Sequence, residues 1–191
     1  MVLADMPYGS TQTSWDSLID FEALWPKLLR VTKPDGANVL TGAGMFTAQL
    51  MISQPALYRY RWTWVKSKAT NFLNASRQPL RKTEDVVVFY REQPTYNPQK
   101  TPGDPYDKGV RTKQTGSYGH MPGTPIKNET GERCPVDVIY IQTAEYEYGG
   151  SKVYHGTQKP VELGRYFVRT YSNPGDTVLD FCCGSGSFPV A

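Results

Sequence analysis

The chain has few cysteines, and they are not placed as in a disulfide-stabilised secreted protein. Only Cys134, Cys182 and Cys183 occur in 191 residues, and two of them are adjacent. An odd count with an adjacent pair predicts free thiols and a reducing compartment. Histidine is rarer still, since His120 and His155 are the two imidazoles of the sequence. We therefore expect no metal site.

Long hydrophobic runs are also missing. No apolar stretch approaches the roughly 20 residues that a membrane-spanning helix requires, and the N-terminus has no signal-peptide pattern. These absences predict a cytoplasmic protein without a membrane partner. With 39% hydrophobic residues the chain can form one domain with a substantial core.

Negative charge is absent from one long stretch. The net charge of +3 is too small to indicate a nucleic-acid partner by itself. Between Arg59 and Glu84, however, every charged residue is basic, and Tyr58, Tyr60, Trp62, Trp64 and Phe72 are interleaved with the cations. This pattern suits phosphate contacts and base stacking, or alternatively a solvated edge of a sheet. We expect Trp62 and Trp64 to belong more to the core than to a DNA surface.

Strand and helix patterns alternate in the first part of the chain. Residues 2–4 and 38–41 have the composition of buried strands, while 21–30 and 45–54 have helical patterns. This alternation favours a mostly parallel sheet with helices on its faces. Residues 58–65 and 85–90 are strand-like and could pair antiparallel across a long loop.

The second part of the chain is less regular. Residues 94–131 show no period and predict either a linker or a functional insertion. Strand patterns follow at 136–141 and 177–180, with a helix at 162–171 between them.

Asp5-Met6-Pro7-Tyr8 directly follows the first predicted strand. A carboxylate and the Met6 carbonyl, whose direction Pro7 restricts, can accept the two N–H groups of an exocyclic amine, and Tyr8 can stack on an aromatic ring. An amine lone pair delocalised into a ring is a poor nucleophile, and such acceptors restore its reactivity. The alternative is a turn with a capping aspartate.

A second motif, Asp180-Phe181-Cys182-Cys183-Gly184-Ser185-Gly186, runs from a predicted strand into a glycine turn. Backbone can approach a nucleotide-like cofactor closely at such a turn. A dinucleotide-binding loop would need a third glycine, but Phe188 and Pro189 follow Ser187.

The stretch His155-Gly156-Thr157-Gln158-Lys159-Pro160, followed by a helix and the glycine turn, is similar to the C-terminal half of DNA amino-methyltransferases that use S-adenosylmethionine. Asp5 to Tyr8 resembles their catalytic Asp-Pro-Pro-Tyr. The order of the motifs matches the permuted subgroup called the beta class. Cys182 replaces a frequent phenylalanine and Met6 replaces a proline. Both changes are tolerable, because an apolar sulfur side chain can fill the first place and the second residue is used through its carbonyl.

This resemblance implies a circularly permuted, Rossmann-like class I methyltransferase sheet of the α/β class, mostly parallel with one antiparallel strand. It implies a catalytic half at 1–93, a target-recognition insertion at 94–150 and a cofactor-binding half at 151–191. The implied catalytic residues are Asp5, Met6, Pro7 and Tyr8, with Tyr8 stacking on a base flipped out of the duplex. The implied cofactor-binding residues are Thr157, Lys159, Asp180, Cys182, Gly184, Ser185 and Gly186, and the implied phosphate contacts are Lys66, Lys68, Arg77, Arg81 and Lys82.

The function implied by the resemblance is methyl transfer from S-adenosylmethionine to N6 of adenine in double-stranded DNA. The alternatives are methylation of cytosine N4 and a non-catalytic DNA-binding remnant. A bacterial or phage-infected cell, a restriction-modification role and a homodimer are further expectations. Family members carry segments before the catalytic strand and after the glycine turn, so we expect a fragment of a longer enzyme, incomplete at both ends and inactive alone.

Overall fold

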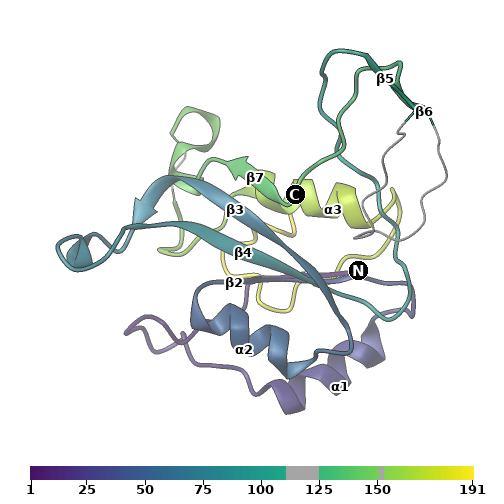
Figure 1. Cartoon of the computed structure of the whole chain (residues 1–191). Coiled ribbons are helices and arrows are strands. Elements are labelled where there is room, and N and C mark those ends of the chain that lie inside the picture. The colour runs from purple at the N-terminus through teal and green to yellow at the C-terminus, as the bar shows by residue number, and fades with distance from the viewer. Residues whose placement is uncertain (111–124, 151–152) are drawn as a thin grey trace. The chain divides into compact units, whose positions relative to one another are not determined.

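The computed structural model describes residues 1–110, 125–150 and 153–191. It divides the chain into two compact units, one of residues 1–97 and 136–191 and one of residues 98–135. The larger unit contains both motifs and is a three-layer α/β structure (Figure 1).

The central sheet has the strand order β1-β2-β4-β3-β7. These strands are β1 (Val2–Ala4), β2 (Asn38–Gly42), β3 (Tyr58–Thr70), β4 (Arg81–Phe89) and β7 (Val138–Ile141). β1 pairs parallel with β2, and β3 pairs parallel with β7, whereas β4 is antiparallel to both of its neighbours. Among the described strands of this sheet β4 alone is reversed, which confirms the predicted fold class.

The predicted strand at 177–180 is reduced to one bridge, between Val2 and Leu179. Three hydrogen bonds nevertheless hold this segment parallel to β1. The amide of Leu3 donates to the carbonyl of Leu179 at 3.0 Å, and that of Leu179 donates to the carbonyl of Met1 at 3.0 Å. The N-terminal amine donates to the carbonyl of Thr177 at 2.8 Å. Asp5 and Asp180 therefore follow neighbouring parallel segments.

Helices cover both faces of the sheet. α1 (Phe21–Val31) and α2 (Met45–Ser53) lie on one face, and α3 (Val161–Tyr171) lies on the other (Figure 1). Alternate residues of each strand join opposite cores, as the two-residue period requires. Val87 packs with α1 and α2, whereas Val86 and Val88 pack with α3.

The two tryptophans of β3 belong to the core, as predicted. Trp62 is 4% exposed and Trp64 2% exposed. Their indole nitrogens donate to the hydroxyl of Tyr171 and to the carbonyl of Ile141, each at 2.8 Å, so burial leaves neither polar group unpaired.

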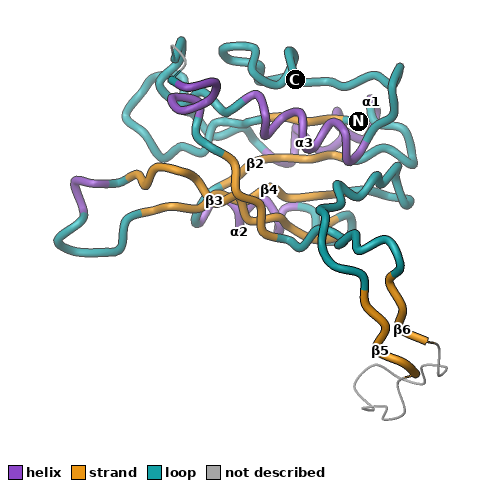
Figure 2. The backbone as a smooth tube through the Cα atoms, turned by 90° about the horizontal axis from the view of Figure 1, so that it is seen from above, coloured by secondary structure: helices purple, strands orange, loops and turns teal. Residues whose placement is uncertain are grey.

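The β3–β4 hairpin runs past its neighbours. β7 pairs with β3 only as far as Lys66. β2 pairs only with residues 85–89 of β4. Thr70 and Arg81 form the last pair of the hairpin, and its tip at 71–80 contains the short 3-10 helix η1 (Phe72–Asn74). The hairpin projects beyond the rest of the sheet (Figures 1 and 2).

The smaller unit contains an antiparallel pair, β5 (Tyr106–Val110) and β6 (Pro125–Asn128), and a bridge between Thr101 and Arg133. The unit is shorter than the insertion predicted at 94–150. Residues 136–150 belong to the larger unit because β7 pairs with β3, and the 3-10 helix η3 (Ala144–Gly149) follows it. No helix in the described part of the chain is long and apolar enough to cross a membrane.

Candidate active site

The two motifs meet in one cavity at the carboxyl ends of the parallel strands. Asp5 follows β1, Thr41 lies near the end of β2, and Asp180 follows the segment paired with β1. The cavity has a volume of about 730 Å³, within the range of small-molecule sites. Open α/β sheets bind their ligands at this edge.

The Asp5 carboxylate is oriented through one of its oxygens. Its Oδ1 accepts hydrogen bonds from the hydroxyls of Thr41 at 2.5 Å and Tyr8 at 2.9 Å. The Lys159 ammonium spans both carboxylate oxygens, at 2.8 Å from Oδ1 and 2.9 Å from Oδ2. Because each oxygen has two lone pairs, Oδ2 keeps acceptor capacity for a further N–H group.

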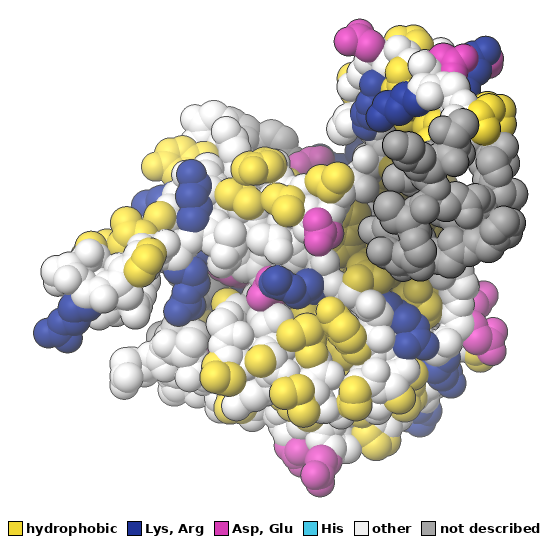
Figure 3. Space-filling model, viewed as in Figure 1, with side chains coloured by type: hydrophobic (Ala, Val, Ile, Leu, Met, Phe, Trp, Pro, Cys, Tyr) yellow, Lys and Arg dark blue, Asp and Glu magenta, His cyan; other side chains and the backbone are white. Residues whose placement is uncertain are grey.

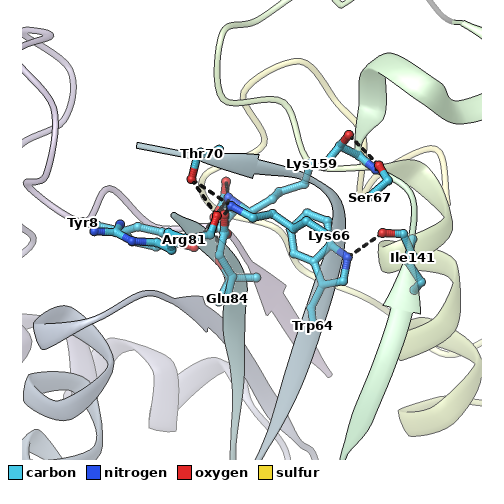
Figure 4. A network of polar contacts seen from close by, with 12 residues as sticks. Tyr8, Trp64, Lys66, Ser67, Thr70, Arg81, Glu84, Ile141 and Lys159 are labelled. Carbon is cyan, nitrogen blue, oxygen red and sulfur yellow. Dashed lines mark hydrogen bonds and ion pairs between the residues drawn. The ribbon is translucent and has the colours of Figure 1, made fainter. Parts of the chain in front are cut away.

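Asp5 is one end of a row of charges that alternate in sign. Figure 4 labels the other members, Lys159, Glu84 and Lys66. Lys159 lies 3.4 Å from Oε2 of Glu84, and Lys66 lies 3.0 Å from Oε1 of the same carboxylate. The side chains of Lys159 and Lys66 are only 10% and 4% exposed. Alternation lets each buried charge be compensated by its neighbours, which isolated buried charges cannot achieve.

Both Lys159 and Tyr8 keep their protons at neutral pH. Burial alone would lower the pKa of Lys159, but the oxygens of Tyr8, Asp5 and Glu84 raise it well above its ordinary value. Burial, followed by the charge of Asp5, raises the pKa of Tyr8 well above its ordinary value. Tyr8 is therefore a permanent hydrogen-bond donor to Asp5. Its ring packs on Phe46 with centroids 4.9 Å apart, and Lys159 lies 5.2 Å from its centroid.

Asp16 holds the loop that follows Tyr8. Its carboxylate accepts backbone hydrogen bonds from Gly9 at 2.9 Å, Ser10 at 2.8 Å and Thr11 at 2.6 Å. Burial would raise the pKa of Asp16, but a hydrogen bond from the Thr11 side chain and these three backbone hydrogen bonds lower it below its ordinary value. The Met6 side chain, 3% exposed, packs in the core formed with α1 and α2. The motif is therefore anchored on both sides of Pro7.

The second motif forms the opposite wall. Oδ1 of Asp180 accepts from the amide of Cys182 at 2.9 Å. Burial raises the pKa of Asp180, and the charge of Asp5 adds to the shift. Burial, followed by the charges of Asp180 and Asp5, raises the pKa of the Cys182 thiol to about 11. Cys182 is therefore a neutral, apolar side chain at physiological pH.

The glycine turn leaves open space beside this wall. Gly184 and Gly186 have φ angles of 49° and 82°, which side chains rarely adopt. A Cβ atom at Gly186 would meet nothing within 4 Å, and one at Gly184 would meet only the Cys182 carbonyl at 3.9 Å. Of the predicted cofactor residues, Thr157, Lys159, Asp180, Cys182, Gly184 and Ser185 line the cavity, and Gly186 does not.

Thr157 contacts His155, which was not predicted as a site residue from the sequence. Its hydroxyl and amide lie 3.1 and 3.3 Å from Nδ1 of His155. The His155 ring in turn packs on Trp15 at 4.9 Å. Both His155 and Trp15 line the cavity.

Lys66 is a correction to the predicted set of phosphate contacts. Two-residue alternation along β3 places it on the buried face with Trp62 and Trp64, where it pairs with Glu84 and lies 3.3 Å from the hydroxyl of Thr70. A phosphate contact does not fit this buried position. Lys68, whose side chain is 57% exposed, lies 3.7 Å from Glu145. Arg77, Arg81 and Lys82 are exposed, and Arg81 also lines the cavity.

Three further members of the site were missed from sequence. Thr41 and Glu84 contact the Asp5–Lys159 pair, and Asp16 supports the loop. One feature of the sequence could have indicated Glu84 as a site residue: it is the first carboxylate after the long basic stretch. Within the residues that the structure describes, no group of three or more histidine, cysteine, aspartate or glutamate side chains could hold a metal ion. His120 lies outside those residues.

Comparisons with known proteins give a consistent result. The N6_N4_Mtase family model, described as DNA methylase, matches residues 1–191. The type II methyltransferase M1.MboII of Moraxella bovis is 24% identical over 207 residues, covering 100% of this chain and 78% of that protein. A crystal structure of an M1.HpyAVI–SAM complex aligns with a TM-score of 0.60 at 18% identity, covering 99% of this chain and 74% of that one. The cytosine-N4-specific PvuII DNA methyltransferase aligns with a TM-score of 0.62 at 14% identity, covering 99% and 69%. At these identities the two structures show the fold.

Proposed function

The chain belongs to the N6/N4 DNA methylase family, and from that membership we propose that it methylates the exocyclic N6 amine of adenine in DNA. The methyl donor of the family is S-adenosylmethionine. The observation that carries the proposal is the meeting of Asp5 and the glycine turn in a single cavity, because an amine acceptor and a donor pocket must be adjacent.

Asp5 is the proposed holder of the target amine. Thr41 and Tyr8 fix the carboxylate through Oδ1, so that Oδ2 can accept an N–H group of the base. The Met6 carbonyl is the proposed second acceptor. Two acceptors localise the nitrogen lone pair, and the carboxylate stabilises the positive charge that develops on the nitrogen during transfer. Tyr8 is the proposed stacking partner of the base.

The second wall fits the methyl donor. Asp180 offers a carboxylate to polar groups of the cofactor, Cys182 offers an apolar contact, and the open position at Gly184 leaves room for close approach. When bound there, the cofactor supplies an electrophilic methyl group. We propose that Thr157, Ser185 and Lys159 complete this pocket. Lys159 would then serve both walls, because it already contacts Asp5.

DNA contacts form the next part of the proposal. Lys68, Arg77, Arg81 and Lys82 are the proposed phosphate contacts, and residues 98–135 the proposed target-recognition unit. A cytoplasmic location in a bacterial or phage-infected cell would place the protein with such a substrate.

The choice of base can be tested directly. Adenine is favoured because the first motif begins with aspartate, where cytosine-N4 enzymes of the resembling family more often begin with serine. DNA treated with the full-length protein and S-adenosylmethionine is digested to nucleosides, which are weighed by mass spectrometry. N6-methyladenine is expected, and N4-methylcytosine without methyladenine would contradict the choice of base.

Asp5→Ala should lower kcat by about 10²-fold or more, because the amine loses a charged acceptor. Asp5→Asn keeps a carbonyl acceptor and should lose less. Transfer of a labelled methyl group to DNA measures the rate, and calorimetry with S-adenosylmethionine should show that cofactor binding persists in both variants. Unchanged turnover in Asp5→Ala would remove Asp5 from the mechanism.

A further inference from the structure

The tip of the β3–β4 hairpin exposes neighbouring large apolar side chains. Phe72 is 75% exposed and Leu73 82% exposed, and Leu80 on the returning strand is 44% exposed. Single exposed apolar residues are common on protein surfaces, but adjacent ones on a projecting turn indicate an interaction site. Apolar and basic side chains lie side by side on this projection (Figure 3).

The tip is a defined turn that keeps both side chains outward. Asn71 has a φ angle of 71°, and among the described residues it is the only non-glycine residue with positive φ. Its side-chain carbonyl accepts from the amide group of Asn74 at 2.7 Å, and its backbone carbonyl accepts from the amide of Asn74 at 3.1 Å. The amide of Arg77 donates to the Asn74 carbonyl at 2.9 Å. A strained residue held by several bonds suggests a functional constraint on the turn.

The position of the hairpin connects its tip to the active site. Thr70 and Arg81, the last pair before the tip, both line the cavity that contains Asp5 and Tyr8. The apolar side chains therefore lie one to three residues beyond the rim of that cavity.

The positive charge around the tip indicates duplex DNA as the partner. Lys68, Arg77, Arg81 and Lys82 flank Phe72 and Leu73, and no carboxylate occurs between Arg59 and Glu84. Duplex DNA matches this arrangement, since it presents phosphates outside and an apolar base stack inside. Apolar side chains of DNA-bending proteins enter the stack in this way while neighbouring cations hold the backbone.

We propose that Phe72 and Leu73 enter the base stack of the DNA substrate beside the target, as a wedge. This proposal rests on the proposed function. A target that leaves the duplex for the cavity breaks its stacking and pairing, and the wedge fills the space that it vacates. Lys68, Arg77, Arg81 and Lys82 hold the phosphates on either side of the wedge.

The test compares two duplexes that contain the methylated site, mapped first on plasmid DNA with the wild-type protein. In one duplex the target base is paired, and in the other it stands opposite an abasic position, so that it leaves the stack easily. Phe72→Ala and Leu73→Ala should lower kcat/KM on the paired duplex by about tenfold to a hundredfold and leave the abasic duplex within about twofold of wild type.

Ile52→Ala is the matched control, because Ile52 is also apolar and is 76% exposed on α2. It should change neither rate. A 2-aminopurine placed beside the target should brighten on binding of wild-type protein and of Ile52→Ala, and less on binding of Phe72→Ala. Thermal unfolding should be the same in all three variants.

Equal losses on the two duplexes, or no loss on either, would overturn the wedge while leaving the proposed function intact. Binding of the tip to anionic lipid vesicles with no effect on DNA would also overturn it. Failure of the full-length wild-type protein to methylate any DNA would overturn the proposed function itself.

Discussion

At the scale of residues, the central feature is one lysine that contacts two carboxylates from distant parts of the chain. Lys159 contacts Asp5, which lies 154 positions earlier in the chain, and also Glu84. Its charge is therefore shared between a proposed acceptor of the target amine and a carboxylate that also holds Lys66. Removing one member of such a buried row leaves an uncompensated charge, which commonly costs about 3–5 kcal/mol. For substitutions in this row of charges, the free energy of unfolding should be measured together with the kinetics, so that a loss of stability is not mistaken for a loss of catalysis.

Asp180 allows a residue-scale test of electrostatics. Its pKa is raised in the folded protein, so the folded state binds more protons than the unfolded state between the two pKa values. Stability is therefore lost as the pH rises through that window, and the penalty is fully present at neutral pH. Asp180→Asn should raise the melting temperature at pH 7 and weaken binding of S-adenosylmethionine.

Melting temperatures measured over a range of pH distinguish the charge of Asp180 from a general packing effect. Melting temperatures of wild type and Asp180→Asn should converge as the pH falls through the ordinary range of an aspartate, and calorimetry at pH 7 measures the cofactor affinity. A gain in stability that is the same at every pH would refute the electrostatic explanation.

At the scale of elements, α3 supports the cofactor wall through a small residue. A Cβ atom at Gly164 would lie 2.8 Å from the Phe188 ring and 2.9 Å from the Ala191 side chain. Phe188 is itself buried, at 6% exposure, and lines the cavity. The close approach of helix and loop thus fixes the wall that follows the glycine turn.

Gly164→Ala should destabilise the protein, although alanine normally favours a helix over glycine by about 0.5–1 kcal/mol. The clash with Phe188 should cost about 1–3 kcal/mol and should also weaken cofactor binding by shifting the wall. Urea unfolding measures the first effect and calorimetry the second. Arg169→Ala, on the exposed side of the same helix, should stay within about 0.5 kcal/mol of wild type.

The sequence predicted most elements because their patterns were local. The helix at 21–30 and the strands at 2–4 and 38–41 followed from periodicity and from flanking proline and glycine. The antiparallel pairing of 58–65 with 85–90 was predicted from the residues, and the family resemblance implied one reversed strand. Neither identified β4 as that strand, since no pattern within a strand encodes its direction. The hairpin strands are longer than predicted because pairing extends them into the basic stretch.

Other features depend on contacts between distant residues. Lys66 looked like its basic neighbours, although the alternation with Trp62 and Trp64 already placed it on the inner face. The contact between Asp5 and Lys159 had no local signal at all, because it exists only when the last segment lies beside β1. Their prediction as members of one site rested on the family resemblance.

At the scale of the whole molecule, the two compact units allow the proposed roles in catalysis and target recognition to be tested separately. The smaller unit begins and ends close together, since Thr101 and Arg133 exchange backbone hydrogen bonds of 3.0 and 2.8 Å. A pair of this kind can be closed by a two-residue turn. The sheet and the candidate active site consist of residues of the larger unit.

Replacing residues 102–132 with Asn-Gly should therefore leave the sheet and cofactor binding in place. If the smaller unit recognises the target, this variant should lose selectivity among DNA sites. Circular dichroism and calorimetry check the first expectation, and sequencing of methylated positions checks the second. An unchanged pattern of methylated sites would refute the recognition role.

The pairing of β1 with residues near 179 has a consequence for how the protein is made. Met1 and Thr177 are joined across 176 positions, so this contact has a high entropic cost of closure and forms late. During synthesis β1, which precedes Asp5, emerges before residues 177–180, and the edge that they cover stays unpaired until they dock. Until then Asp5 and the glycine turn do not share a cavity, and the uncovered edge of β1 is a site at which a nascent chain can aggregate.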